Sequence, residues 1–214
     1  EEYGGDPRVL AAIQSEEGLM YFGTASTGIH EYDGVSWRSL FQRNEVKTVQ
    51  SFTKDATGRI FYVGSDFGYL NVDPTGETQA VSLLHLIPED LQTNFSAFEI
   101  HYLNGSILLR TASHYIIRLE LNDDLTLKSL KSWQAETRFA KSFVVGNDFY
   151  VQQAERGLCR LEDQEIKLIP GTEIFGEERI GLILPYLSKD GKSLLIVGRI
   201  TGFYLFEDDI LTKF

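Results

Sequence analysis

Short apolar stretches separated by turns run along the whole chain. Five of them follow a turn glycine and are rich in Phe, Tyr, Ile, Leu and Val, which are residues favoured in β-strands; they span residues 19–23, 60–64, 107–111, 148–152 and 194–198. In each copy, one further apolar stretch precedes the glycine turn, and two more apolar stretches follow the strand that comes after the turn. Helical periodicity is weak, because the best candidate, Leu83 to Leu91, is interrupted by Pro88. The pattern predicts an all-β protein.

The strand pattern is repeated five times. The turn glycines before the strands are Gly18, Gly58, Gly105, Gly146 and Gly191. In each copy, the strand after the glycine turn is followed by a second strand. These second strands begin at residues 28, 68, 115, 157 and 202, and their first residues are therefore 40, 47, 42 and 45 positions apart. Each copy holds four hairpin-connected strands, and the second strands are apolar on both faces. Four short strands at this period, with two buried faces, are typical of the blades of a β-propeller.

The repeat sets the expected domain organisation. We expect one propeller domain or fragment over residues 1–214, with blades at approximately 8–46, 47–95, 96–139, 140–180 and 181–214. A β-sandwich would show no internal copy at this period, and a parallel β-helix would need a shorter one. A closed ring of five blades is physically allowed. Residues 208–214 offer no obvious closing strand, however, and this favours a fragment that exposes two apolar blade faces and forms a homodimer through them.

Composition excludes several classes of function. The chain has 31 acidic and 20 basic residues, a formal charge of -11, and no cluster of Lys and Arg. Binding to a nucleic-acid backbone therefore lacks its electrostatic contribution. A single cysteine excludes a disulfide framework. There is no apolar run of about 18 residues, so we expect a soluble segment that makes no membrane contact of its own.

Residues able to carry chemistry are few. His30 and Cys159 occupy matching positions of two copies where the other copies have apolar residues, so we interpret both as core residues. His85 and His101 lack a partner at zinc-ligand spacing. Three acidic pairs are predicted to be solvated turn residues, because they lack the glycine-centred pattern of a calcium loop: Asp123 with Asp124, Glu177 with Glu178, and Asp208 with Asp209. We predict no metal, cofactor or catalytic residue.

The loops between the two central strands of each blade are the predicted ligand-binding region, because in a propeller they lie together on one rim of the central channel. The candidates there are Asp66, Phe67, His114, Arg156 and Arg199. Connections between blades on the same rim add Arg43, Arg138 and Arg179. Arginines facing one opening of an acidic protein would favour an anionic or hydrogen-bonding ligand. The alternative is that these exposed arginines only increase solubility.

The first two copies resemble the repeat of the two-component regulator propeller family, the extracytoplasmic sensor region of bacterial signalling proteins. The residues that carry the resemblance are 17–24 (Glu-Gly-Leu-Met-Tyr-Phe-Gly-Thr), Tyr32-Asp33-Gly34 with Trp37, and 58–65 in the second copy. The resemblance covers residues 3–73 well and fades afterwards. It implies a propeller that is usually seven-bladed, with this chain as its N-terminal blades, followed by a membrane helix and a kinase or cyclase domain.

The same resemblance implies a function. We expect a non-catalytic sensor module that binds a small solute, such as a carbohydrate or an anion, or a protein partner, on the periplasmic or extracellular side of a bacterial inner membrane. Two alternatives stay open. One is a propeller enzyme, a lyase or hydrolase acting on carbohydrates, which would need clustered carboxylates or a metal at the channel. The other is a protein-interaction scaffold.

Overall fold

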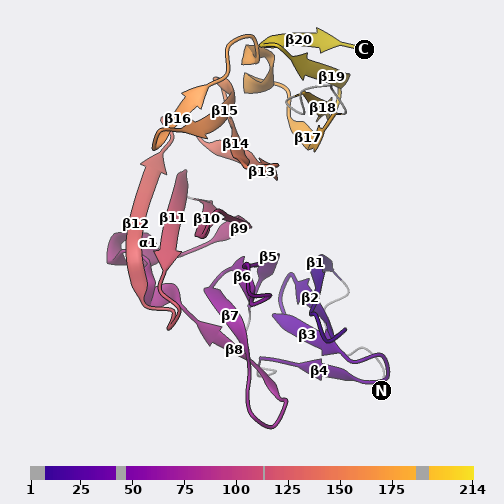
Figure 1. The fold of residues 1–214 in the computed structure, drawn as a ribbon, viewed down its shortest axis with the longest axis vertical. Helices are drawn as coiled ribbons and strands as arrows, with labels where there is room; N and C mark the ends of the chain where they lie inside the picture. The colour runs from indigo at the N-terminus through magenta and orange to yellow at the C-terminus, as the bar shows by residue number, and fades with distance from the viewer. Residues whose placement is uncertain (1–7, 42–46, 113, 187–192) are drawn as a thin grey trace. The chain divides into compact units, whose positions relative to one another are not determined.

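The chain forms five four-stranded antiparallel sheets, as drawn in Figure 1. The computed structural model describes residues 8–41, 47–112, 114–186 and 193–214. In every sheet the strands are hydrogen-bonded in chain order, so that each sheet is a simple meander. The prediction of an all-β protein built from four-stranded units is therefore confirmed.

The strands have the following bounds. The first sheet contains β1 (Val9–Gln14), β2 (Met20–Thr24), β3 (Ile29–Tyr32) and β4 (Trp37–Ser39). The second contains β5 (Val49–Lys54), β6 (Ile60–Gly64), β7 (Phe67–Val72) and β8 (Thr78–Ser82), and the third β9 (Ala97–Leu103), β10 (Ser106–Thr111), β11 (Tyr115–Leu121) and β12 (Leu127–Gln134). The fourth contains β13 (Phe139–Val145), β14 (Asp148–Gln153), β15 (Gly157–Glu162) and β16 (Glu165–Leu168), and the fifth β17 (Ile180–Pro185), β18 (Leu194–Gly198), β19 (Gly202–Glu207) and β20 (Ile210–Lys213).

Helical structure is confined to three short segments in the described part of the chain. The 3-10 turn η1 (Leu84–Leu86) and the helix α1 (Glu89–Gln92) lie on either side of Pro88, and a second 3-10 turn, η2 (Glu173–Gly176), precedes β17. Pro88 is the residue before α1, where its missing N–H costs nothing. The proline thus divides the stretch from Leu83 to Leu91 into two turns instead of one helix.

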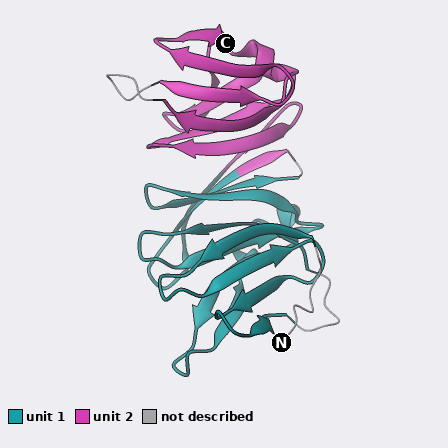
Figure 2. Ribbon diagram, turned by 90° about the vertical axis from the view of Figure 1, so that its right-hand side faces the viewer, with its two compact units in different colours: residues 1–113, 117–131 teal, residues 114–116, 132–214 magenta. Residues whose placement is uncertain are grey.

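The chain divides into two compact units, coloured separately in Figure 2. Unit 1 comprises residues 1–113 and 117–131, and unit 2 comprises residues 114–116 and 132–214. Inside each unit the first strand of a sheet contacts the first strand of the next sheet: β1 contacts β5 and β5 contacts β9 in unit 1, and β13 contacts β17 in unit 2. Contact between successive first strands is the arrangement expected of propeller blades.

The apolar residues shared by neighbouring sheets form a core in each unit. In unit 1, Tyr21 and Ile29 of the first sheet pack with Val49, Tyr62 and Leu70 of the second sheet. In unit 2, two sheets and η2 contribute to one cluster, whose largest members are Phe143, Tyr150, Phe175, Tyr204 and Phe206. Hydrophobic burial between neighbouring sheets holds each unit together.

The second sheet deviates from the alignment that the sequence repeat indicates. The carbonyl oxygen of Phe67 accepts the backbone hydrogen bond from the residue after the fourth strand, as the carbonyls of Ile29, Leu158 and Phe203 do in their sheets. Phe67, and not Gly68, therefore begins the second of the two central strands. A Cβ on Gly68 would meet the Tyr62 hydroxyl at 2.5 Å, so glycine stands there because of packing and not because of a turn.

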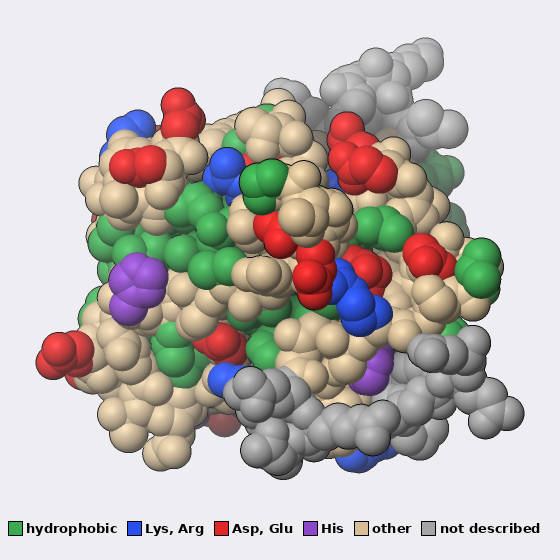
Figure 3. Space-filling view, turned by 90° about the horizontal axis from the view of Figure 1, so that it is seen from below, with side chains coloured by type: hydrophobic (Ala, Val, Ile, Leu, Met, Phe, Trp, Pro, Cys, Tyr) green, Lys and Arg blue, Asp and Glu red, His purple; other side chains and the backbone are tan. Residues whose placement is uncertain are grey.

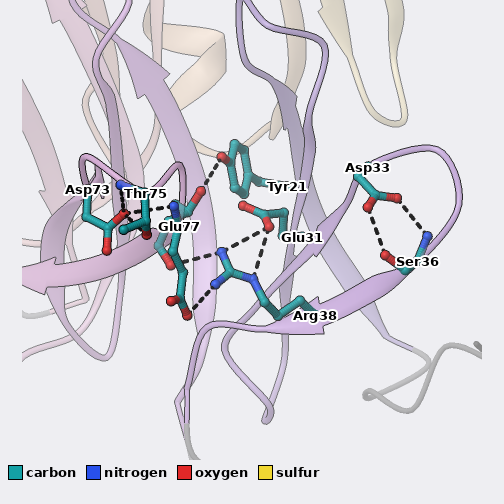
Figure 4. Close-up of polar contacts among 9 residues, drawn as sticks. Tyr21, Glu31, Asp33, Ser36, Arg38, Asp73, Thr75 and Glu77 are labelled. Carbon is teal, nitrogen blue, oxygen red and sulfur yellow. Dashed lines mark hydrogen bonds and ion pairs between the residues drawn. The ribbon is translucent and has the colours of Figure 1, made fainter.

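A polar network joins the first two sheets within unit 1 (Figure 4). The guanidinium of Arg38 lies between two carboxylates, with Nη2 at 3.0 Å from Glu31 Oε1 and Nη1 at 2.8 Å from Glu77 Oε1. Arg38 Nη2 also donates to the carbonyl oxygen of Thr78 at 3.0 Å, and the Tyr21 and Thr78 hydroxyls are 3.0 Å apart. The network connects β3 and β4 of the first sheet with the start of β8 in the second sheet. It therefore fixes the distance between the fourth-strand edges of these two sheets.

The surface carries charges of both signs. On the face drawn in Figure 3, acidic and basic side chains are scattered among apolar ones. Neither sign gathers into a large patch on this face of the described residues.

Candidate ligand-binding rim

The arginines predicted to bind a ligand lie at one end of the two sheets of unit 2. Arg138 precedes β13 and Arg179 precedes β17, while Arg156 and Arg199 lie in the hairpins between the two central strands. The Ala154 N–H donates to the Arg138 carbonyl at 3.0 Å, and the Arg199 N–H donates to the Arg179 carbonyl at 2.8 Å. In both sheets, therefore, the hairpin and the connection form one edge, which we call the rim of unit 2.

A buried glutamine braces this rim. Gln152, with 2% of its surface exposed, donates from Nε2 to the carbonyl oxygens of Phe175 and Glu178, both at 2.6 Å. Its Oε1 accepts the N–H of Ile180 at 3.1 Å. One amide thus satisfies three backbone groups of the connection between the fourth and fifth sheets, which would otherwise be buried without partners. Gln152 fixes the approach of that connection to the hairpin carrying Arg156.

Glu178 holds the second hairpin of the rim. Its side chain is buried, and Oε1 accepts the backbone N–H groups of Ile200 at 2.7 Å and Thr201 at 3.5 Å. The expectation that the pair Glu177 with Glu178 consists of solvated turn acids is therefore wrong for Glu178. A short-range sequence pattern gives no sign of this role, because the groups that Glu178 binds lie more than twenty residues further along the chain.

The four arginine side chains of the rim are exposed, and none of them forms an ion pair with a residue that the structure describes. Arg156 Nη1 donates to the side-chain oxygen of Gln153 at 3.2 Å, and this leaves most of its N–H groups to solvent. Glu136, Glu155 and Glu177 are exposed in the same loops. The rim is accordingly a mixed surface with unpaired guanidinium groups, and not a uniformly positive one.

His114 also belongs to unit 2 and is exposed. Its backbone has a φ of 73°, in the left-handed region, and its ring Nδ1 is hydrogen-bonded to the carbonyl oxygen of Thr137. Because a carbonyl can only accept, the ring nitrogen Nδ1 is the donor in this contact. The Thr137 hydroxyl donates in turn to the Ala154 carbonyl at 2.6 Å, so His114 is tied to the rim.

Two of the predicted residues have buried, structural roles in unit 1. Asp66 is 6% exposed; its Oδ1 accepts the Phe67 N–H and the Ser82 hydroxyl, both at 2.8 Å, and its Oδ2 accepts the Tyr62 hydroxyl at 3.3 Å. Phe67 has no exposed surface. Burial, with the nearby Asp66 carboxylate, raises the pKa of Tyr62. Neither Asp66 nor Phe67 presents a surface to a ligand. Arg43 lies outside the described residues.

The buried histidine and cysteine behave as core residues, as predicted. His30 is 6% exposed and Cys159 has no exposed surface. Burial lowers the pKa of His30 and raises the pKa of the Cys159 thiol. Both shifts favour the neutral form, which is the form suited to a buried position. Over the described ranges, no three His, Cys, Asp or Glu side chains are grouped as a metal site would require.

The sequence matches no protein-family model and no curated protein. Solved structures do match. Virginiamycin B lyase from Staphylococcus aureus has a TM-score of 0.66 at 14% identity, covering 99% of this chain and 71% of that one. The extracellular domain of the hybrid two-component system BT4673 from B. thetaiotaomicron also has a TM-score of 0.66 at 14% identity, covering 99% of this chain and 28% of that one.

A third match is the WD40 β-propeller domain of Doa1, with a TM-score of 0.64 at 11% identity, covering 98% of this chain and 69% of that one. These proteins differ in what they do but share the propeller fold. At such identities the likeness shows the fold alone.

Among the described helices, none has the length and apolar character needed to cross a bilayer.

Proposed function

We propose that the chain is a non-catalytic, ligand-binding propeller module of a bacterial signalling protein, placed on the periplasmic or extracellular side of the inner membrane. The observation that carries the proposal is the rim of unit 2, where four exposed arginines without ion pairs are set on loops braced by Gln152 and Glu178. Because the backbone of these loops is already held in place, binding costs little loop-ordering entropy. The likeness to the extracellular domain of a hybrid two-component system supports the sensory role.

The ligand that fits this rim is a small solute with carboxylate or hydroxyl groups, such as a uronic acid or another organic acid. Guanidinium groups bind carboxylates through paired hydrogen bonds, and acidic residues between them can accept hydrogen bonds from hydroxyls. The signal would pass to a kinase or cyclase domain elsewhere in the full protein. Self-association through sheet faces stays a prediction; in unit 2 the exposed face that it would use carries Leu182, Leu184 and Phe203.

The test is a thermal-shift screen of the chain with neutral sugars, uronic acids and dicarboxylic acids, because a ligand that binds the folded state raises its Tm. The variant Arg156→Gln with Arg199→Gln should weaken binding of the ligand found by at least about 100-fold, since it removes two charged hydrogen bonds worth about 1.5 to 3 kcal/mol each. Lys213→Gln, an exposed change on β20, is the matched control. An unchanged affinity in the double variant would remove both arginines from the site.

One observation favours a second candidate, a propeller lyase. His114 is an exposed imidazole held at the rim by its contact with Thr137, and imidazole is the side chain used most often as a general base. Virginiamycin B lyase has the same fold. Chemical turnover of a member of the screening panel, instead of a Tm shift alone, would support this candidate over the sensor.

A further inference from the structure

A cavity of about 230 Å³ lies inside unit 1, between hairpins of the second and third sheets. These hairpins join β5 to β6, β9 to β10, and β11 to β12. By the antiparallel order of the strands, they lie at the end of the sheets opposite to Asp66. The volume is below the range of about 300 to 1,000 Å³ typical of drug-sized ligands, so an occupant would be a single ring or a short chain.

The inner wall of the cavity is apolar. Phe61 and Ile107 line it and are 2% and 3% exposed, and they are joined by Tyr102 and Leu121, which are half-buried. Phe61 lies on β6 of the second sheet, and the other three belong to the third sheet. An apolar group placed against this wall would be removed from water. Two aromatic rings can also attract a cation that approaches a ring face.

Polar groups stand at the mouth of the cavity, and one of them is an unpaired carboxylate. Asp123, in the hairpin between β11 and β12, is exposed and has no hydrogen bond or ion pair with a described residue. On the opposite hairpin, Arg59 Nη1 lies 4.0 Å from Asp55 Oδ2. Asp55 therefore offsets the charge of Arg59, and the three charged residues together leave one net negative charge at the mouth.

We propose that this cavity binds a small organic amine, with its ammonium group beside Asp123 and its apolar body against Phe61, Ile107 and Tyr102. The net charge of the lining favours a cation over a neutral molecule or an anion of the same shape. The chain as a whole carries a charge of -11, and this acts in the same direction. The amine site is separate from the rim of unit 2 and shares no residue with it.

The experiment uses four probes with the same phenyl-ethyl body: phenethylamine, a cation; phenylalanine, a zwitterion; phenethyl alcohol, which is uncharged; and 3-phenylpropionate, an anion. Calorimetry gives the affinities, and the backbone amide signals of Gly105 and Leu125, which line the cavity, report the location. We expect phenethylamine to bind at least tenfold more tightly than the other three and to shift both signals. Equal binding of the alcohol, or tighter binding of phenylalanine or phenylpropionate, would overturn the proposal.

Two variants identify the carboxylate. Asp123→Asn should weaken phenethylamine binding about tenfold and leave binding of phenethyl alcohol unchanged. Asp90→Asn, at an exposed acid of α1 that does not line the cavity, should change neither affinity. An unaltered phenethylamine affinity in Asp123→Asn would refute the site. The paired change at Arg156 and Arg199 should not affect phenethylamine, so that failure of this proposal and failure of the rim proposal can be told apart.

Discussion

The second and fourth sheets, which belong to different units, secure their loops by different means. Near the end of β6 in unit 1, Gly64 has no side chain, and the backbone of Thr48 occupies the space that a Cβ would need. Near the end of β14 in unit 2, Gln152 binds the passing backbone through its amide. A close backbone approach and a buried hydrogen-bonding side chain are thus alternative ways to hold a connection against a sheet. In the pairing of the two central strands Gln152 corresponds to Val63, so its amide acts one residue before the position that Gly64 occupies in the second sheet.

The turns at the far ends of the sheets differ between the units as well. In unit 1, Asp33, Asp73 and Asp124 each accept a backbone N–H inside their own hairpin. In unit 2, two-residue turns with positive φ angles at both positions close two hairpins, at residues 163–164 and 208–209. Such turns match the twist of the strands that they join. The hairpins between the third and fourth strands therefore use carboxylates in unit 1 and backbone conformation in unit 2, whereas the β9–β10 hairpin of unit 1, with positive φ at Asn104 and Gly105, resembles those of unit 2.

The largest effect is expected from Gly64→Ala. The new Cβ would overlap the Thr48 carbonyl, which cannot move without displacing β5, so unit 1 should lose about 3 kcal/mol of its free energy of unfolding. Urea denaturation gives the total, and amide hydrogen exchange shows which unit opens. Gly146→Asn is the control, because that glycine has a φ of 62° that Asn tolerates and no atom lies near its Cβ position. A stability change below about 0.5 kcal/mol in Gly64→Ala would contradict the close approach.

A smaller loss, of about 2 kcal/mol, is expected from Gln152→Leu, and it should be confined to unit 2. The leucine keeps most of the volume but leaves the carbonyls of Phe175 and Glu178 and the N–H of Ile180 without this partner. Hydrogen exchange at Ile180 should accelerate, while amides of unit 1 keep their protection. Gln79→Leu, at an exposed position of β8, provides the matched change without burial. Uniform loss of protection in both units would show that Gln152 does not act locally.

The smallest effect concerns pH. Hydrogen bonds from the backbone of Ser36 and Val35 lower the pKa of Asp33 from 3.8 to about 2. A lowered pKa in the folded state means that this carboxylate stabilises the turn above pH 4 and that its contribution is lost as the pH falls from about 4 to 2. NMR titration of the Asp33 carboxyl should give a midpoint near 2. The hairpins of unit 2 at residues 163–164 and 208–209 serve as the control, and their NMR signals should not change over the same pH range. A midpoint near 4 for Asp33 would show that its hydrogen bonds do not persist in solution.

Much of the fold could be predicted because its signals are local. The apolar stretches at residues 60–64 and 194–198 coincide with β6 and β18, since a strand buried on both faces is a continuous apolar run. The error in the second sheet arose because Gly68 imitates a turn glycine. Glycine is required at position 68 because the Tyr62 side chain lies against it, and the pairing of β6 with β7 places Tyr62 there.

The candidate rim was predicted less completely. In a meander, the hairpin between the two central strands and the connection from the previous sheet lie at the same end of the sheet. The backbone hydrogen bonds that the carbonyls of Arg138 and Arg179 accept agree with this expectation. Asp66 could not be recognised as a buried residue from its neighbours in sequence. Its environment comes from Ser82, sixteen residues further along, and from the Tyr62 ring. The same distance in sequence concealed the roles of Gln152 and Glu178.

The sequence alone determined the five copies, their all-β character and the edge on which their loops gather. The apolar pattern of the strands and the residues of the turns each involve only a few neighbouring positions, so both can be recognised from the sequence. Only the tertiary structure decided which polar residues of those loops are exposed. Burial of a carboxylate or an amide depends on backbone groups that approach from a different strand or from the next sheet, and that approach is set by packing rather than by the residues beside it in the chain.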